Sequence, residues 1–541
     1  MKARVILLGG ILFGILLGCS SDTPGNQQPN ILFIVADDLG FTDLGAFGSE
    51  ISTPNLDELA FAGVRLNNFH TDRACQQTRV MMMTGRGVSG ALEYFPPAEG
   101  SRERRNRLSL NWATLPELLQ DAGYRTYMAG KWDLGIEEGY TPATRGFDRS
   151  FVQLGASASH FAENFWDDYS LYESDGDPVE YQDMPDNFYS TNYYTQRMLE
   201  FLESGTDQEP WFAYLPYTTP HWPLQVPEGE LDRYAGQYGE GYDVLRSSRV
   251  NSANQLGVIP GGLNLDNFEP VAAPWEELSV EEQAKYSRAQ EIYAAMVSNL
   301  DTNVGRLVSY LRDSGQLEST VIMFTSDHGA SSGEFGQGPV GGVSANTPPG
   351  VGPQIPAFID NSFGNWGRPN SFIDHGQGFA EAATAPLKGY KGRISEGGLR
   401  AAAFIHFPDL AVSGSIDGSF MTIMDVLPTF LDIAGTVHSG PGDYKGRKIG
   451  GIAGRSAWPY LNGETDTVHL PTDSAGWVQG ELGALIKGNY KITNQRVPGV
   501  DGPLSWQLYD IMSDPGETQD LASQYPELVS ELLTEWETNW R

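Results

Sequence analysis

The chain has 541 residues, which is longer than one ordinary domain, and large α/β enzymes reach this length by adding a small subdomain and long loops to one core. Hydrophobic residues make up 40% of it, with 12 Trp, 24 Tyr and 25 Phe, and this excludes wholesale disorder. The formal net charge of -34 argues against nucleic acid as a partner, because phosphate backbones are bound by clustered lysine and arginine.

The N-terminus has the pattern of an export signal followed by a polar tether. Lys2 and Arg4 precede an apolar run from residue 5 to residue 17, which is too short to span a membrane. The run ends in Leu-Leu-Gly and Cys19, a sequence that resembles the cleavage site of bacterial lipoproteins, where the cysteine is lipidated and becomes the first mature residue. An ordinary cleaved signal peptide with a coincidental cysteine is the alternative.

We therefore expect residues 1–18 to be removed and residues 19–28 to tether an exported protein through lipid on Cys19. The pattern resembles that of lipoproteins of the bacterial outer membrane, so the protein is expected in the periplasm or at the cell surface. The mature sequence contains no predicted transmembrane helix, and the lipid is the only membrane contact that we predict.

Export leaves Cys75 as a lone thiol. The chain has two cysteines, and with Cys19 used for lipid, no partner remains for a disulfide in the compartment where one is most expected. Just after Cys75 the sequence predicts a short helix over residues 78–84 that ends at Gly85. A nucleophile near a helix N-terminus benefits from backbone N–H groups and a positive dipole, which favour an anionic substrate.

Four apolar stretches have the composition of buried strands, and each leads into polar residues. In open parallel sheets the functional crevice lies outside the carboxyl ends of the strands, so we expect these polar residues to converge in space. The stretches and the residues that follow them are 30–36 with Asp37 and Asp38, 124–130 with Lys131, 211–216 with His221, and 321–326 with Asp327 and His328.

Helical patterns alternate with these strands. Thr114 begins a helix that Gly123 closes. A capping box at Ser279 and Glu282 opens a long helix, whose apolar residues recur every three or four positions up to Gly315. The alternation of strands and helices predicts an α/β fold of the doubly wound type.

Two regions depart from this alternation. Residues 329–386 are rich in Gly, Pro, Ser and Asn, and we interpret them as a wall or lid over the crevice, with a flexible surface insertion as an equal alternative. Beyond residue 457, short apolar stretches predict a small antiparallel sheet, and an acidic amphipathic helix is expected over residues 526–540. The predicted organisation is one large domain over residues 29–456 and a C-terminal subdomain over residues 457–541.

Short motifs recur in a specific order over nearly the whole mature sequence. They are residues 29–40, 52–60, 75–79, 130–132, 219–224, 325–329, 391–398 and 508–517. Singly most are weak, but together they identify the chain as a member of the formylglycine-dependent, arylsulfatase-like (type I) sulfatases of the alkaline phosphatase superfamily. The resemblance implies a central mixed, mostly parallel sheet flanked by helices, with a small C-terminal antiparallel sheet plus helix.

In that family the motif cysteine is oxidised to formylglycine, whose hydrate attacks the sulfur of a sulfate ester and expels sulfate as the aldehyde re-forms. The resemblance implies that Cys75 is this residue, that a formylglycine-generating enzyme is a maturation partner, and that Arg79 holds the oxygens of the nucleophile. It also implies that three residues bind the sulfate oxygens or protonate the leaving group, namely Lys131, His221 and Lys391. By the same resemblance, Ser159 and His160 reach the substrate.

Acidic residues at two strand ends predict a metal site. Asp37, Asp38 and Asp327 supply hard oxygen ligands that suit calcium, with magnesium as the alternative. By resemblance, Cys75 and His328 complete the set, and His328 stands where many relatives carry Asn. Paired Asp residues after a strand are also common as helix caps, and an imidazole has the alternative role of orienting a carboxylate or the substrate. We predict one divalent cation.

Two positions depart from the family pattern. Gln77 stands where the modification motif has Pro or Ala, which bears on whether Cys75 is converted. Asp133 stands where the family has the histidine that helps to deprotonate the hydrated aldehyde. An aspartate is a weaker base than histidine unless burial raises its pKa.

These departures leave three functions open. The first is hydrolysis of sulfate monoesters, on a sulfated carbohydrate or small molecule, with a variant maturation signal. The second is a hydrolase of related esters such as phosphate diesters, and the third is a catalytically degenerate, glycan-binding surface lipoprotein. We favour the first. The retained metal ligands and basic residues favour hydrolysis over binding, and ligands for a single metal favour a sulfate or a phosphate diester over a phosphate monoester.

Overall fold

The computed structural model describes residues 28–541, apart from residues 89, 96–104, 164–170, 206–208, 262, 264–267, 334–358, 409 and 496–503. The predicted signal peptide, Cys19 and nearly all of the predicted tether lie outside the described residues. Among the helices in the described part, none combines the length and the apolar composition that crossing a bilayer requires.

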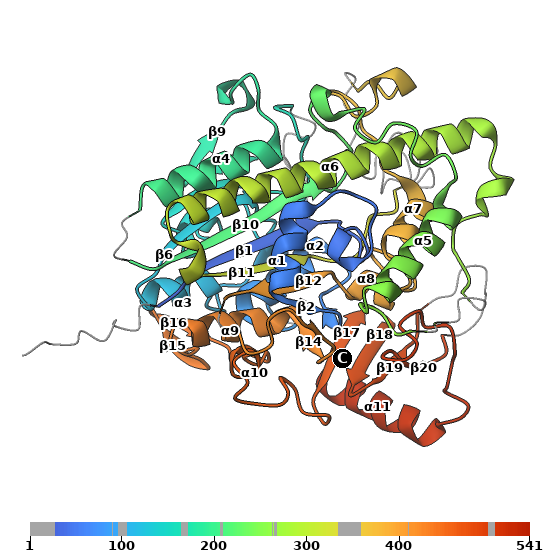
Figure 1. Cartoon of the computed structure of the whole chain (residues 1–541). Coiled ribbons are helices and arrows are strands. Elements are labelled where there is room, and N and C mark those ends of the chain that lie inside the picture. The colour runs from blue at the N-terminus through green and yellow to red at the C-terminus, as the bar shows by residue number, and fades with distance from the viewer. Residues whose placement is uncertain are drawn as a thin grey trace, which may run out of the picture.

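A sheet of ten described strands forms the centre of the molecule (Figure 1). In spatial order the strands are β13 (Ile416–Asp417), β2 (Val64–Leu66), β12 (Ala403–His406), β11 (Thr320–Ser326), β1 (Asn30–Asp37), β10 (Trp211–Pro220), β6 (Arg125–Lys131), β7 (Arg149–Gln153), β8 (Tyr172–Ser174) and β9 (Asp177–Val179). The strands from β11 to β7 in this order are parallel, whereas β12 and β8 join them antiparallel. The expected mixed, mostly parallel sheet is confirmed.

Helices cover both faces of this sheet, because alternate residues of a buried strand point to opposite faces. On β1, the residues Leu32, Ile34 and Ala36 join one core cluster, and Ile31, Phe33 and Val35 join another. The first cluster includes residues of α1 (Pro54–Ala62), α4 (Ser190–Glu203), α5 (Tyr242–Gln255), α6 (Val280–Asp313) and α7 (Gly376–Ala383). The second includes residues of α2 (Cys75–Thr84), α3 (Leu115–Asp121), α9 (Val426–Ile433) and α10 (Trp458–Leu461).

In the described part of the chain, three small pairs of strands lie outside the large sheet. They are β3 (Phe69–His70) with β14 (Met421–Thr422), β4 (Leu92–Phe95) with β5 (Arg105–Leu108), and β15 (Gly442–Tyr444) with β16 (Arg447–Ile449). The short helix α8 (Glu396–Leu399) precedes β12.

Both predicted capped helix starts are confirmed. Thr114 and Glu117 form the capping box of α3, and Ser279 and Glu282 form that of α6. In each case the side-chain oxygen of the capping residue and the glutamate satisfy backbone N–H groups that the first turn leaves free.

The helix predicted over residues 78–84 begins earlier, at Cys75. The N–H of Thr78 already bonds to the carbonyl of Ala74 at 3.1 Å, which closes the first turn. Gly85 ends the helix with a φ of 62°, as expected of a glycine at a helix C-terminus. Cys75 is therefore the first residue of α2 and not a residue ahead of it.

Residues 329–386 are partly described, since residues 334–358 lie outside the described ranges. The described remainder includes α7, which is largely buried, so this part is not all loop. The carbonyl of Ala383 at the end of α7 accepts a hydrogen bond from the N–H of Thr42 at 2.9 Å, and this packs α7 against the turn after β1. That the whole region forms a lid stays a prediction.

An antiparallel sheet of four described strands lies in the C-terminal subdomain, as predicted (Figure 1). It consists of β17 (Ser474–Gln479), β18 (Leu482–Lys487), β19 (Tyr490–Thr493) and β20 (Gln507–Asp510). One face packs against Trp536 of α11 (Pro526–Asn539). The other face, with Trp477 and Tyr509, packs against Ile394 and Leu399 of the large domain.

Candidate active site

The carboxyl ends of β1 and β11 bring three aspartates and a histidine together at one edge of the large sheet, namely Asp37, Asp38, Asp327 and His328. The strands are parallel neighbours with Ala36 opposite Ser326, so the residues that follow them leave the sheet side by side. The N–H of Asp38 donates to Oδ1 of Asp327 at 3.3 Å. Asp38 has a φ of 69°, a left-handed conformation that non-glycine residues adopt only where the surroundings hold it.

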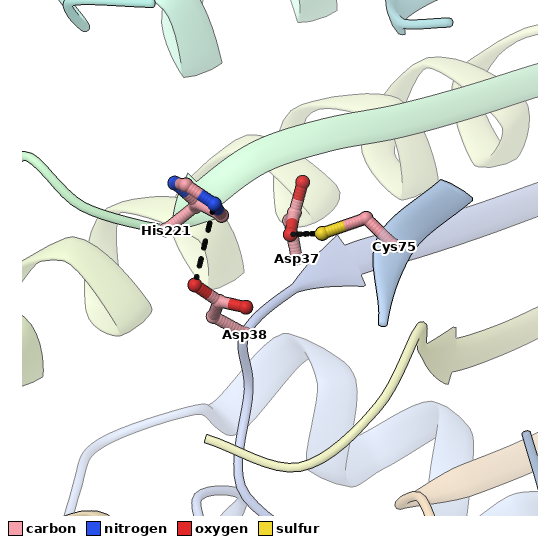
Figure 2. A group of neighbouring side chains, drawn as sticks. All are labelled: Asp37, Asp38, Cys75 and His221. Atoms are coloured by element: carbon pink, nitrogen blue, oxygen red, sulfur yellow. Dashed lines mark hydrogen bonds and ion pairs between the residues drawn. The ribbon is translucent and has the colours of Figure 1, made fainter. Parts of the chain in front are cut away.

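The sulfur of Cys75 points into this cluster (Figure 2). It lies 3.4 Å from Oδ1 of Asp37 and 3.2 Å from Nε2 of His328. The hydroxyl of Thr78, one turn along α2, donates to the carbonyl of Asp327 at 2.7 Å and so ties the start of the helix to the end of β11. Burial raises the pKa of the Cys75 thiol well above its ordinary value.

Arg79 lies beneath the same carboxylates. Its Nη2 is 3.2 Å from Oδ2 of Asp37 and 3.1 Å from Oδ2 of Asp327, and all three side chains are fully buried. Its Nη1 donates to the carbonyl of Lys131 at 2.9 Å. Arg79 thus links the ends of β1, β11 and β6, while its expected contact with the oxygens of the nucleophile stays a prediction.

Two lysines flank the cluster, and each pairs with a different aspartate. Nζ of Lys131 lies 2.6 Å from Oδ2 of Asp37, and Nζ of Lys391 lies 2.6 Å from Oδ1 of Asp38. Burial would raise the pKa of Asp37, but Lys131 and other nearby cations hold it well below its ordinary value. Burial raises the pKa of Asp38 well above its ordinary value in spite of Lys391, so its charge is less well compensated.

His221 faces the same cluster from the end of β10 (Figure 2). Its Nε2 lies 3.6 Å from Oδ2 of Asp38, and its Nδ1 lies 2.5 Å from the carbonyl of Trp222. A carbonyl accepts but does not donate, so Nδ1 carries the proton in the neutral ring. Burial lowers the pKa of His221 well below its ordinary value, and Lys391 lowers it further.

The predicted substrate pair lies behind His221. His160 is buried, with Nε2 2.9 Å from the carbonyl of His221 and Nδ1 2.8 Å from Oγ of Ser190. The hydroxyl of Ser159 bonds to Gln225 at 2.9 Å. Both residues therefore support the loop of His221, and direct contact with a substrate stays a prediction for them.

The residues at this edge fit a divalent cation. The ligand atoms of Asp37, Cys75, Asp327 and His328 lie within 4.8 Å of one another, and a second group shares Asp37 and Cys75 and adds Asp38 and His221. Oδ2 of Asp38 is buried and finds no hydrogen-bond partner among the described residues. Nδ1 of His328 lies 2.9 Å from the carbonyl of Gly329, which leaves the lone pair of Nε2 facing the cluster, as in metal-binding histidines.

A family model described as Sulfatase matches residues 29–436, which is most of the chain. The chain belongs to the sulfatase family. The family lies in the alkaline phosphatase superfamily, and its members are sulfuric ester hydrolases. The match covers β1, α2, β6, β10 and β11, the elements that carry the cluster around Cys75.

Two relatives match this sulfatase over most of their length. It is 39% identical over 531 residues to an uncharacterized sulfatase of Schizosaccharomyces pombe, covering 94% of this chain and 93% of that one. It is 33% identical over 434 residues to an arylsulfatase of Klebsiella aerogenes, covering 78% of this chain and 90% of that one.

Solved structures share the fold of the sulfatase. A structure of Ps i-CgsB in complex with k-i-k-neocarrahexaose has a TM-score of 0.65 at 23% identity and covers 94% of this chain and 92% of that one. A structure of BT4656 in complex with its substrate, D-glucosamine-2-N,6-O-disulfate, has a TM-score of 0.60 at 19% identity and covers 94% of this chain and 97% of that one.

Asp133 of the sulfatase lies just beyond β6, next to the cluster. It has a φ of 56°, is 9% exposed, and its carbonyl accepts a hydrogen bond from the side chain of Gln76 at 3.0 Å. Burial raises the pKa of Asp133 to about 6, although Lys131 and Arg79 oppose the rise. The environment therefore shifts this aspartate towards the pKa range of the histidine that the family has there.

Sequence reasoning missed Glu396, although its motif, residues 391–398, was recognised. This glutamate is fully buried and forms ion pairs with Arg400 at 2.7 Å and with Lys491 of the C-terminal sheet at 2.9 Å. A charged residue among glycines in a motif is the signal that could have identified it. Its partner Lys491 had no such signal, because a single lysine in a strand is normally exposed.

Proposed function

We propose that this sulfatase hydrolyses sulfate monoesters of a carbohydrate, with formylglycine formed from Cys75 as the nucleophile. One calcium ion would be bound by Asp37, Asp38, Asp327 and His328 together with residue 75, with magnesium as the alternative. The observation that carries the proposal is the convergence of these side chains with the Cys75 sulfur in two overlapping groups, each with its ligand atoms within 4.8 Å.

Charge at the site favours a singly charged ester. The site has three aspartate side chains and three cationic side chains. The aspartates are Asp37, Asp38 and Asp327, and the cations are Arg79, Lys131 and Lys391. Burial lowers the pKa of His328 to about 4, so this ring is neutral. A bound divalent cation would leave a net positive site, and a sulfate monoester brings one negative charge to it.

The residues of the chain supply the remaining chemistry. When present, the hydrated aldehyde at residue 75 supplies the attacking oxygen. Lys131 and Lys391, each with its ammonium 2.6 Å from a carboxylate of the cluster, are placed to hold sulfate oxygens. His221 would donate a proton to the leaving oxygen once an anionic ester is bound and its Nε2 has been protonated, and Asp133 would take the proton of the nucleophile.

A carbohydrate substrate is supported by likeness. Two proteins of the same fold are crystallised with a neocarrahexaose and with a disulfated glucosamine. The partner that we propose is therefore a sulfated glycan or a small sulfated sugar, together with a formylglycine-generating enzyme during maturation.

The test combines mass spectrometry and turnover. Peptides that contain residue 75 are analysed from protein made in its native host, and the same protein is assayed with an aryl sulfate, a phosphate monoester and a phosphate diester. Formylglycine at residue 75 with calcium-dependent release of sulfate supports the proposal. Faster turnover of the phosphate diester would support the related hydrolase instead, and saturable glycan binding without release would support the degenerate binder.

We also infer that the enzyme is exported and lipid-anchored. The support is the apolar run and the Leu-Leu-Gly sequence before Cys19. Cys19→Ala expressed in a bacterium should move the protein from the membrane fraction to the soluble fraction, and unchanged membrane association would contradict the inference.

A further inference from the structure

Lys491 is a fully buried lysine of the C-terminal subdomain. It lies on β19, with Nζ 2.9 Å from Oε1 of Glu396 and 2.9 Å from Oε1 of Glu517. None of the three side chains has appreciable exposed surface. Lysine is almost never fully buried unless it is paired, because removing an ammonium from water has a large desolvation penalty. Packing alone is better served by an apolar residue, so the position of this charge calls for a function.

Glu396 carries the connection from Lys491 into the large domain. Its Oε2 lies 2.7 Å from Nε of Arg400 and 3.0 Å from Nε2 of His70. Its backbone N–H donates to Oε2 of Glu517 at 3.1 Å. The side chain and the backbone of this one residue are thus held from several directions. We refer to Lys491, Glu396, Glu517, His70 and Arg400 as the Lys491 cluster.

Lys391 lies in a tightly folded loop that leads into Glu396, the first residue of α8. The N–H of Gly397 donates to the carbonyl of Lys388 at 2.9 Å, which closes the loop. A side chain on Gly397 would lie 2.2 Å from the carbonyl oxygen of Gly389, so the two ends of the loop touch. These contacts hold the segment that carries Lys391 against the residue that follows Glu396.

The loop and the subdomain also contact the segment that carries the nucleophile. The N–H of Gly392 donates to the carbonyl of Arg73 at 2.7 Å, just before Cys75. Nε1 of Trp477, on β17 of the subdomain, donates to the carbonyl of Thr71 at 2.9 Å. The C-terminal sheet therefore supports two segments that form the active site.

We propose that Lys491 is a positioning residue: through Glu396, the Lys491 cluster holds the loop so that the ammonium of Lys391 stays 2.6 Å from Asp38. The inference rests on the proposed function, in which Lys391 binds the sulfate group. Lys491 acts on the reaction through the loop and not by touching the substrate. The C-terminal sheet then contributes to the geometry of the active site without contacting the substrate through Lys491.

A double-mutant cycle tests this proposal. Lys491→Met, Lys391→Met and the double variant are compared in kcat and KM with an aryl sulfate, at a temperature well below each Tm. Lys491→Met should lower kcat/KM on the order of tenfold, less than the ~100-fold that a displacement of about 1 Å can cause. In the Lys391→Met background the same change should have less than about a twofold effect, because residues that act on one group are not additive. Equal losses in both backgrounds would overturn the proposal.

Lys487→Met is the matched control. Lys487 lies in the same sheet and also pairs with two glutamates, Glu531 at 3.0 Å and Glu535 at 2.8 Å, but on the surface of the subdomain. Its loss should leave kcat/KM unchanged within about twofold, as for exposed ion pairs.

Glu517→Gln keeps the test decisive if Lys491→Met does not fold, since Lys491 remains paired with Glu396. This variant should lower kcat/KM by about two- to threefold and raise the inhibition constant of inorganic sulfate in the same proportion. Folded Glu517→Gln with both constants unchanged would overturn the proposal. A wild-type enzyme with formylglycine and calcium that releases no sulfate would refute the proposed function instead. The variants would then be compared by their affinity for inorganic sulfate.

Discussion

Nζ of Lys391 lies 2.6 Å from Oδ1 of Asp38, although 353 positions separate the two residues in the chain. The other oxygen of Asp38 is buried and has no hydrogen-bond partner in the described part of the chain. A buried carboxylate with one oxygen neutralised and one unsatisfied is poised for a cation, because leaving such a group unpaired is costly.

Asp38→Asn should weaken calcium binding, because it removes one of three carboxylate charges from the ligand set. We expect the dissociation constant to rise by at least about 100-fold, the upper end of what changes outside the first ligand shell cause. Isothermal titration calorimetry on the metal-free protein measures this directly. Asp57→Asn is the control. Asp57 lies outside the site, and its Oδ1 accepts a hydrogen bond of 2.7 Å from the N–H of Ala46.

Calcium should also stabilise the wild-type fold. At a free concentration of about 100 times the dissociation constant, binding adds about 2.7 kcal/mol to the free energy of unfolding. Chelation should therefore lower the Tm of the wild type but not that of Asp38→Asn. Equal Tm shifts in the two proteins would contradict a calcium site at Asp38.

Asp133 should set the acid limb of the pH profile. Burial raises its pKa to about 6, and a base works only when deprotonated, so kcat should be retained above this pH and lost as the pH falls through it. Asp133→Asn should lower kcat by about 10²- to 10⁴-fold, the range for a general base. Asp133→His should keep more activity than the asparagine variant. A kcat that stays flat well below pH 6 would remove Asp133 from the mechanism.

Arg79→Met should destabilise the fold strongly. The change leaves Asp37 and Asp327 buried without their guanidinium, and breaking a buried pair costs about 3–5 kcal/mol. Urea unfolding of the metal-free protein measures the loss. Arg125→Met is the control, because its pair with Glu209 is about half exposed and should change stability by no more than ~1 kcal/mol. Similar losses in both variants would show that Arg79 does not balance the buried carboxylates.

Gln77→Pro should increase the fraction of Cys75 that is converted to formylglycine, since it restores the residue type of the family motif. Gln77 lies in the first turn of α2, where the backbone N–H has no partner within the helix, so proline should not disturb the fold. Peptide mass spectrometry quantifies residue 75 in both proteins made in the same host. An unchanged or lower fraction would show that Gln77 is already an adequate recognition residue.

Much of the fold was predictable because its signals are local. The apolar run of β1, the capping boxes of α3 and α6 and the antiparallel C-terminal sheet each arise from side chains a few positions apart. The start of α2 was predicted too late, because Cys75 has a low helix propensity and the residue before it, Ala74, is not a side-chain capping residue. The N–H of Thr78 and the carbonyl of Ala74 settled that boundary.

The candidate site was predictable in its residue types but not in its contacts. Strand ends pointed to Asp37, Asp38 and Asp327, since parallel strands expose their carboxyl ends at one edge. No pattern indicated that Arg79 bridges two of these carboxylates. Arg79 lies on a helix, and its partners lie at the ends of three separate strands.

By itself, the sequence determined the strand and helix types, the order of the family motifs, and the departures at Gln77 and Asp133. Only the tertiary structure decided that burial brings the pKa of Asp133 to about 6, and that Lys491 of the C-terminal sheet pairs with Glu396 of the large domain. The physical reason is that desolvation and ion pairing depend on which distant segments pack together, and packing is a property of the whole fold.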